Sequence, residues 1–311
     1  MSTYAPIILI VFNRPEHTKR VIEALSANPL ALESDLHIFS DGSRGPKDDA
    51  SVQAVKNVIQ KIEGFKQVYL HLRIKNVGCS SNVLTAVDTV LESYDKCIVV
   101  EDDILVAPNF LEFMNQALNY YQDNETIFSI GAFHPFFKIP AKYPHEVYAL
   151  GRNCSWGWGV WKNSWKKINL DPKQIRKELS DSRIRKAFAQ HGEDTLRTFE
   201  HDPEIWDLRV SYGQWKCGLM TIFPTHSFTE NIGRDGSGVH YHGNALKVES
   251  QSHFPGKIPN FVPLIGIDES IRLAHKKSTH KSILRIKTTQ LLKKTGLYLP
   301  LFRLWEKLGL Q

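Results

Sequence analysis

Apolar runs and amphipathic stretches alternate along residues 6–102. The apolar runs predict β-strands, and they cover residues 6–12, 35–43, 67–74 and 96–102. Between them, apolar side chains recur at the three- and four-residue spacing of a helix, over residues 14–28, 49–63 and 80–94. This alternation predicts an α/β fold in which a mostly parallel sheet is flanked by helices on both faces.

The pattern changes after the fourth predicted strand. Residues 107–121 predict one more helix and residues 126–133 one more strand. From about residue 134 to 245 the periodicity loosens into aromatic, glycine-rich and charged segments. We therefore interpret 1–132 and 133–274 as two halves of one domain, followed by a basic amphipathic tail at 275–311.

Bulk composition places the chain among ordinary globular proteins. An apolar fraction of 42% with a charged fraction of 23% gives no indication of disorder. The four cysteines lack a CxxC pair, which favours a reducing compartment over a disulfide scaffold. The first residues contain too few apolar positions for a secretory signal, and no apolar run is long enough to span a bilayer. We expect a cytoplasmic protein.

Positive charge is concentrated in the tail. Residues 276–311 contain nine Lys or Arg and one acid, Glu306, which gives this segment a charge of +8. The whole chain has a net charge of +6, so the remaining residues carry −2. A nucleic-acid-binding protein would spread such charge over a folded face, so we expect no nucleic acid as partner. The tail suits an anionic membrane surface, which would place the protein at the inner face of the cell membrane. The alternative is a C-terminal helix that docks on the body with a solvated basic face.

Acidic residues follow the fourth predicted strand. Glu101, Asp102 and Asp103 stand together directly after "KCIVV", and their mutual repulsion calls for a positive partner. Carboxylates are ligands for Mg²⁺ or Mn²⁺, which bind nucleotides through one or two acids and the phosphates. Asn13 with Arg14, and Asp41, end two other strands, and the carboxyl ends of parallel strands share one edge of the sheet. The alternative is that the acids only cap the next helix.

Several segments resemble one enzyme family. The stretch "VVEDDILVAPNFLEFMNQAL" resembles the acidic motif and following helix of the N-acetylglucosaminyltransferase I family, and "FPTHSFTENIGRDGSGVHY" resembles its Pro-x-x-Ser-x-Thr segment and mobile glycine-rich loop. "EIWDLRV" and "IFSDGS" are similar to two further segments. The match runs in order from about residue 6 to 243, and it implies the glycosyltransferase A fold.

The resemblance also implies a role for particular residues. Asp103 would bind the metal that bridges the donor diphosphate, Asp207 would be the catalytic base, and the loop 231–241 would close over the donor. The other donor contacts that it implies are Glu101 with the sugar hydroxyls, Asp102 with the ribose, Asp41 with the nucleobase and Arg14 with the nucleotide. We also expect Asn13, Trp158, Arg234 and His240 to contact the nucleotide sugar, with the Trp158 ring suited to stacking on a sugar. Residues 1–132 would then bind the nucleotide sugar and 133–274 the acceptor.

General chemistry supports these roles. A bound metal stabilises the negative charge that develops on a departing nucleoside diphosphate. A hydroxyl attacks efficiently when a carboxylate takes its proton, and one base opposite the leaving group gives inversion. We therefore expect an inverting glycosyltransferase that uses Mn²⁺ or Mg²⁺ and a nucleotide sugar, most simply a UDP-sugar. Its acceptor would be a glycan, including a lipid-linked one, in surface polysaccharide synthesis.

Simpler explanations remain open for several of these residues. Asp207 could pair with Arg209, Asp41 with Gly42 could form only a turn, and Trp156, Trp158 and Trp161 could be core. His226, His240 and His242 could instead form a metal cluster. The segment 74–87 departs from the family pattern, which leaves the donor sugar open. Rival functions are a sugar nucleotidyltransferase, although the chain lacks its glycine-rich loop after the first strand, a metal-dependent phosphoesterase, and an inactive carbohydrate-binding relative.

Overall fold

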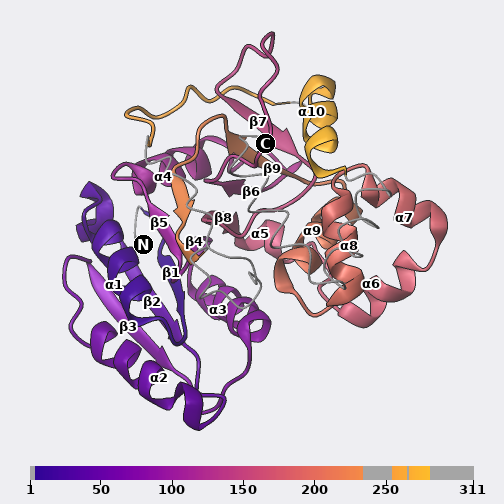
Figure 1. Ribbon diagram of the computed structural model, residues 1–311. Coiled ribbons are helices and arrows are strands. Elements are labelled where there is room, and N and C mark those ends of the chain that lie inside the picture. The colour runs from indigo at the N-terminus through magenta and orange to yellow at the C-terminus, as the bar shows by residue number, and fades with distance from the viewer. Residues whose placement is uncertain (1–3, 234–253, 265, 281–311) are drawn as a thin grey trace, which may run out of the picture.

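The computed structural model describes residues 4–233, 254–264 and 266–280. In this part of the chain an eight-stranded sheet has the order β3-β2-β1-β4-β8-β6-β9-β7, and β5 and β10 form a separate ribbon (Figure 1). The strands are β1 Ile7–Val11, β2 Asp35–Ser40, β3 Gln67–Leu72, β4 Lys96–Glu101, β5 Ile104–Val106, β6 Ile127–Gly131, β7 Val147–Leu150, β8 Trp158–Trp161, β9 Met220–Pro224 and β10 Thr229–Asn231.

Strand direction confirms the predicted fold class. β1 pairs in parallel with both β2 and β4, and β2 pairs in parallel with β3. β8 runs antiparallel to β4 and β6, and β7 runs antiparallel to β9. The sheet is thus mostly parallel, and its first four strands lie where the apolar runs predict them.

Helices cover both faces of the sheet. They are α1 Pro15–Ser26, the 3-10 helix η1 Pro29–Glu33, α2 Pro46–Ile59, α3 Cys79–Ser93, α4 Phe110–Tyr120, α5 Lys162–Trp165, α6 Pro172–Leu179, α7 Ser182–Ala189, α8 Glu193–His201, α9 Trp206–Lys216 and α10 Glu269–Thr279. α1 and α2 each begin with proline, whose missing N–H costs nothing in the first turn.

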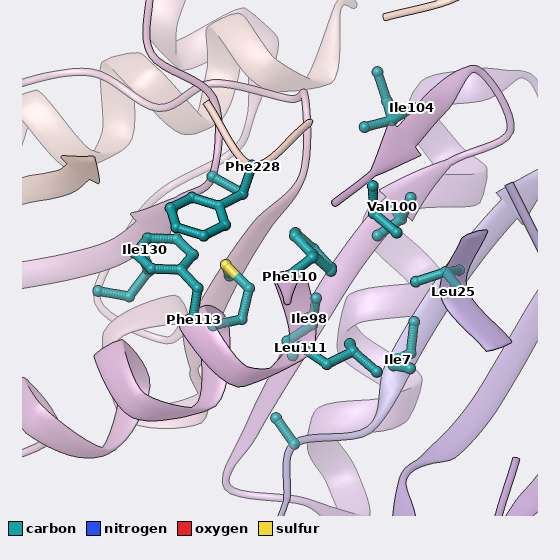
Figure 2. Close-up of a cluster of buried hydrophobic side chains, with 14 of the residues drawn as sticks. Ile7, Leu25, Ile98, Val100, Ile104, Phe110, Leu111, Phe113, Ile130 and Phe228 are labelled. Carbon is teal, nitrogen blue, oxygen red and sulfur yellow. The ribbon is translucent and has the colours of Figure 1, made fainter. Parts of the chain in front are cut away.

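Alternate residues of each central strand enter two different cores. Ile7, Leu9 and Val11 pack with α1, α2 and α4, whereas Ile8 and Ile10 pack with α3 and α9. This follows from the two-residue period of a strand. Figure 2 shows the first core, where Phe110, Leu111 and Phe113 of α4 lie against side chains of β1, β4 and β6.

The loosely patterned second half has two structural parts. β7, β8 and β9 extend the sheet, while α6, α7 and α8 pack with α9 around a separate apolar cluster at one side of the molecule (Figure 1). These three helices are short and charged, which explains why residue periodicity did not reveal them. Because one sheet contains strands from both sides of residue 132, the two predicted halves form one body.

The predicted tail boundary requires correction. Helix α10 runs through residues 274 and 275, and its Ile271 and His275 are buried, with Ile271 in a cluster that includes Tyr148 and Phe223. The start of the tail therefore belongs to the folded body. Residues 281–311, which carry the remaining basic and apolar positions, lie outside the described residues. Among the described helices, none combines the length and the apolar character needed to cross a bilayer.

Candidate active site

The acidic triplet lies where β4 ends. Glu101 is the last residue of β4, and the chain turns at Asp102 and Asp103 before β5 begins at Ile104. Strand β1 pairs with β4 in parallel, so the loop after β1, with Arg14, reaches the same edge of the sheet. The structure thus brings Arg14 and the triplet together from segments that are far apart in sequence.

Arg14 is the positive partner of the acids. Its Nη1 donates to Asp103 Oδ2 at 3.0 Å, and its Nη2 donates to Asp102 Oδ1. The Asp102 side chain is 4% exposed and that of Arg14 21% exposed, so the pair is largely shielded from water. Burial alone would lower the pKa of Arg14, but the attraction of Asp102 and Asp103 outweighs it and raises that pKa. Arg14 therefore stays charged.

Asp102 differs from its expected role at the ribose. Its second oxygen, Oδ2, accepts a hydrogen bond from the backbone N–H of Phe12 at 3.3 Å, while Oδ1 holds Arg14. With both oxygens engaged and the residue only 3% exposed, the carboxylate orients Arg14 rather than facing a ligand. Asp103 keeps more access, since 16% of its side chain is exposed.

Glu101 carries the strongest electrostatic perturbation of the triplet. Burial raises its pKa well above the usual value, and Asp103, Asp207 and Asp102 raise it further, while Arg14 acts in the opposite direction. Burial likewise raises the pKa of Asp102. Four carboxyl groups therefore share this region with one guanidinium, and an additional cation would stabilise their charged forms.

Asp207 reaches this region although it stands more than a hundred residues after the triplet. It lies in the first turn of α9. The backbone N–H of Trp206 donates to Ser80 Oγ at 3.1 Å, and the neighbouring Cys79 places its Sγ 3.9 Å from Glu101 Oε2. The start of α9 is thus held against the start of α3, directly beside Glu101.

The alternative pairing of Asp207 with Arg209 is not favoured by helix geometry. Residues two apart on a helix face away from each other. Arg209 donates through Nε to the carbonyl oxygen of Leu170 at 2.6 Å, and its Nη1 lies 3.9 Å from Glu204. Asp207 instead shares a helix face with Ser211, whose Oγ accepts a hydrogen bond from the Asn153 N–H.

Strand β10 brings Gly233 to the acids. β10 pairs antiparallel with β5, and the next residue, Ile232, donates its N–H to the carbonyl oxygen of Asp103 at 2.8 Å. A Cβ atom on Gly233 would lie 2.4 Å from Asp103 Oδ2 and 2.9 Å from Arg14 Nη1. Only glycine therefore fits here without displacing the ion pair.

Asp41 organises a loop instead of facing the nucleobase. Its Oδ1 accepts from the N–H groups of Gly42 and Val77 at 2.8 and 2.9 Å, and its Oδ2 accepts from the Gly78 N–H and the Asn76 side-chain amide, each at 3.0 Å. These four bonds fill the acceptor capacity of a carboxylate. The residue is 3% exposed, so the predicted nucleobase contact is wrong for this conformation.

Trp158 is a core residue. It is 0% exposed and packs against Trp206 and Trp165, with ring centroids 5.4 and 5.9 Å away. The predicted stacking on a sugar is therefore wrong for this side chain. It instead packs against Trp206, the first residue of α9. Asn13 lies at the correct edge, where its amide donates to Asp48 at 2.9 Å. Arg234 and His240 lie outside the described residues.

The acids at the end of β4 offer oxygen ligands for a divalent cation. Within the described residues, no group of three or more His, Cys, Asp or Glu side chains could enclose a metal. Mg²⁺ and Mn²⁺ bound with nucleotides use one or two carboxylates and take their other ligands from phosphates and water. Asp103, whose side chain is more exposed than that of Asp102, fits that arrangement. His226 forms no such group with the other described residues, and His240 and His242 are outside them.

Residue patterns missed two neighbours of the site, while a third, Gly233, lies within the predicted loop 231–241. Cys79 Sγ lies 3.9 Å from Glu101 Oε2. Burial acts to lower the pKa of Arg152, but Asp194 and, to a smaller extent, Asp207 raise it, so Arg152 lies within electrostatic reach of Asp207. Arg152 also pairs with Asp194 at 3.0 Å. A single cysteine or arginine has no distinguishing spacing, so only the folded arrangement identifies Cys79 and Arg152.

Comparison with known proteins gives distant matches. No family model matches the chain. Similar solved structures include a mannosyltransferase from Pyrobaculum calidifontis in complex with GDP-Man and Mn²⁺, with 11% identity, a TM-score of 0.40, and coverage of 70% of this chain and 74% of that one. Residues 1–349 of TarS from S. aureus match with 10% identity, a TM-score of 0.42, and coverage of 75% and 61%. Scores this low decide neither fold nor function, which rest on the chain's own structure.

Proposed function

We propose that this chain is a glycosyltransferase of the glycosyltransferase A type, which transfers a sugar from a nucleotide sugar to a hydroxyl group of a glycan. The observation that carries the proposal is the convergence of Glu101, Asp103, Arg14 and Asp207 at the carboxyl edge of a mostly parallel sheet. Ligands of open α/β sheets bind at this edge. The resemblance to the N-acetylglucosaminyltransferase I family agrees with it.

Arg14 and Asp103 would bind the donor diphosphate. A divalent cation, Mn²⁺ or Mg²⁺, would be held by Asp103 and supply positive charge to the leaving diphosphate. Arg14 would turn one of its donors from the carboxylates toward a phosphate oxygen, since guanidinium suits both partners. Glu101, the last residue of β4, would accept hydrogen bonds from donor sugar hydroxyls.

Asp207 would activate the acceptor. As the acceptor oxygen bonds to the anomeric carbon, its proton passes to the Asp207 carboxylate. The bond from that carbon to the phosphate oxygen breaks, and its electron pair leaves with the nucleoside diphosphate. A single base on the face opposite the leaving group gives inversion of the anomeric centre, by the logic that separates inverting from retaining glycosidases.

A nucleotide-sugar panel tests the proposal. We expect one UDP-sugar, among UDP-, GDP- and dTDP-sugars, to raise the melting temperature with Mn²⁺, since a ligand at 100 times its Kd stabilises by about 2.7 kcal/mol. The same pair should release nucleoside diphosphate. Asp103→Ala should lose the metal-dependent part of this shift, whereas the exposed-site control Asp49→Ala should keep it. No shift with any donor would refute the function.

We further propose that residues 281–311 hold the enzyme at the cytoplasmic face of the membrane, beside a lipid-linked polysaccharide acceptor. The proposal rests on their Lys, Arg and large apolar residues. Fractionation of cells that express the chain truncated after His280 tests it. A truncated chain that remains equally membrane-bound would rule the tail out as the anchor.

A further inference from the structure

Three aromatic rings gather at the end of β6. Phe133 lies 5.1 Å from Phe136 and 4.4 Å from Trp156, and Phe136 lies 5.8 Å from Trp156, measured between ring centroids. Phe133 is 8% exposed, whereas Phe136 is 65% exposed and Trp156 is partly exposed. We call Phe136 and Trp156, with Phe133 beneath them, the aromatic platform.

The loop that carries Phe136 is fixed on both sides. The His134 N–H donates to Ser227 Oγ at 2.9 Å, and the His134 ring lies within hydrogen-bond distance of Tyr148 Oη at 2.7 Å and of the Phe137 carbonyl oxygen at 2.8 Å. Phe137 is itself buried. Phe136 is therefore presented to solvent by an anchored turn, which lowers the entropy lost when a ligand contacts it.

The platform shares the edge of the sheet with the acids. β6 runs in the same direction as β4, since each is antiparallel to β8 between them. Phe133 follows the end of β6 just as Asp103 follows the end of β4. Trp156 is also tied to the site, because its carbonyl oxygen accepts from Thr229 Oγ1 at 2.7 Å. From Thr229 the chain reaches Gly233, beside Asp103, within four residues, at most about 14 Å.

Gly157 maintains this connection. Its φ of +79° is one that side-chain-bearing residues rarely adopt, and a Cβ there would lie 2.8 Å from Thr229 Cγ2. The glycine lets the chain turn so that Trp156 stays at the surface while Trp158 enters the core. The tryptophan-rich segment thus divides into one ring for the surface and one for packing.

We propose that the aromatic platform is an acceptor subsite that binds one sugar ring of a glycan chain, beyond the residue that is glycosylated. This inference rests on the proposed function. A pyranose offers a face of C–H groups with weak positive charge, which suits the negative face of an aromatic ring. Its edge carries hydroxyls, and Ser227, whose Oγ accepts from the His134 N–H at 2.9 Å, supplies a polar side chain beside the loop that carries Phe136.

The size of the platform favours a sugar over a protein partner. An aromatic side chain can bury about 150–250 Å². Two partly exposed rings therefore offer well under the roughly 800 Å² that each partner contributes to a stable protein interface. A single sugar ring matches the available surface, and the anchored loop supplies a rigid face for it.

The test separates acceptor binding from donor binding. The full chain is applied, with UDP and Mn²⁺, to an array of defined immobilised oligosaccharides, and the thermal shift with UDP and Mn²⁺ is measured in parallel. We expect wild-type protein to bind a subset of the saccharides. Phe136→Ala and Trp156→Leu should each weaken that binding by about two- to tenfold, the effect of one lost aromatic contact. The thermal shift should stay unchanged.

Leu32→Ala provides the matched control. Leu32 is 69% exposed and lies in η1, just before β2. It is therefore at the amino ends of the parallel strands, whereas the acids follow the carboxyl ends. Its substitution should leave saccharide binding at the wild-type level. Saccharide binding that survives in Phe136→Ala, or a wild-type protein that binds none of the saccharides, would overturn the subsite. Either result could occur with a normal nucleotide response, so it would leave the donor site and the proposed function standing.

Discussion

Asp102 and Asp103 share the guanidinium of Arg14. Removing one member of a buried ion pair leaves a charge without compensation, which is costly in a region of low dielectric. The two aspartates also hold the positively charged Arg14 at the place where the proposed diphosphate would bind. At the scale of single residues, the site is therefore held together by the same charges that would do its chemistry.

The Arg14 pair predicts a stability effect that metal should reverse. Arg14→Met keeps the length of the side chain and removes its charge, so it should destabilise the metal-free protein by about 3 kcal/mol. Mn²⁺ should then stabilise the variant more than the wild type, because Asp102 and Asp103 lack their cation. Urea unfolding with and without Mn²⁺ measures both effects.

Lys19→Met is the control for this substitution. Arg14 is the residue directly before α1, and Lys19 lies within that helix. The Lys19 side chain is 60% exposed, and its Nζ lies 3.9 Å from Glu23 Oε1, so it forms a surface pair with little effect on stability. Equal Mn²⁺ stabilisation of Arg14→Met and wild type would contradict the counter-ion role.

Asp207 predicts a separation of binding from turnover. Asp207→Asn preserves shape but accepts no proton, so we expect donor binding near the wild-type level and a kcat lower by about 10²-fold or more. Steady-state kinetics and the thermal shift with donor measure the two quantities. Glu204→Gln, a nearby exposed acid, should retain its rate. A rate close to wild type in Asp207→Asn would place the base elsewhere.

At the scale of elements, the β5–β10 ribbon connects the acids to the second half of the chain. β10 starts beside the aromatic platform and leads to Gly233 at the ion pair. Its pairing with β5 is short, only three residues on each strand, and it is reinforced by the bond from the Ile232 N–H to Asp103. The ribbon therefore fixes the distance between the acids and the aromatic platform.

This close approach makes Gly233 sensitive to substitution. Gly233→Ala should push Asp103 and Arg14 apart and destabilise the protein by about 1–3 kcal/mol, the usual effect of overpacking. The melting temperature should fall, and Mn²⁺ should raise it by less than in the wild type. Gly256→Ala is the control, because its added Cβ would meet no atom within 4 Å. If the two alanine variants behave alike, the contact at Gly233 has no energetic importance.

At the scale of the whole molecule, buried histidines should set its acid stability. His275 of α10 is 3% exposed, and burial lowers its pKa from 6.5 to about 3, with Arg152, His191 and His134 acting in the same direction and Asp194 against it. Between these values the unfolded chain binds a proton that the native protein does not. The free energy of unfolding should therefore fall as pH drops below 6.5.

Replacing this histidine tests the linkage. His275→Phe keeps a ring next to Phe137 and cannot titrate, so the slope of unfolding free energy against pH should decrease by up to one proton, about 1.4 kcal/mol per pH unit. Urea unfolding from pH 4 to pH 7 measures it. His145→Phe, at an exposed position, should change the slope little. An unchanged slope in His275→Phe would mean that the helix opens before this group protonates.

The sequence by itself determined the α/β class, the first four strands with their helices, and the presence of an acidic group at a strand end. It could do so because strand and helix periodicity, and runs of like charge, are local properties. Asp207 was named as the catalytic base through resemblance and not through pattern, and the structure places it near Glu101. Its chemical role stays a prediction.

Only the tertiary structure decided which charge faces the acids and which rings face solvent. Arg14 lies 88 residues before Asp102, Gly233 lies far beyond both, and Trp156 and Trp158 differ only in which side of Gly157 they occupy. Likewise, the strand-end position of Asp41 predicts a ligand contact, whereas four donors surround its carboxylate in the folded protein. Burial and partner choice depend on segments that meet through the sheet, and no local pattern contains that information.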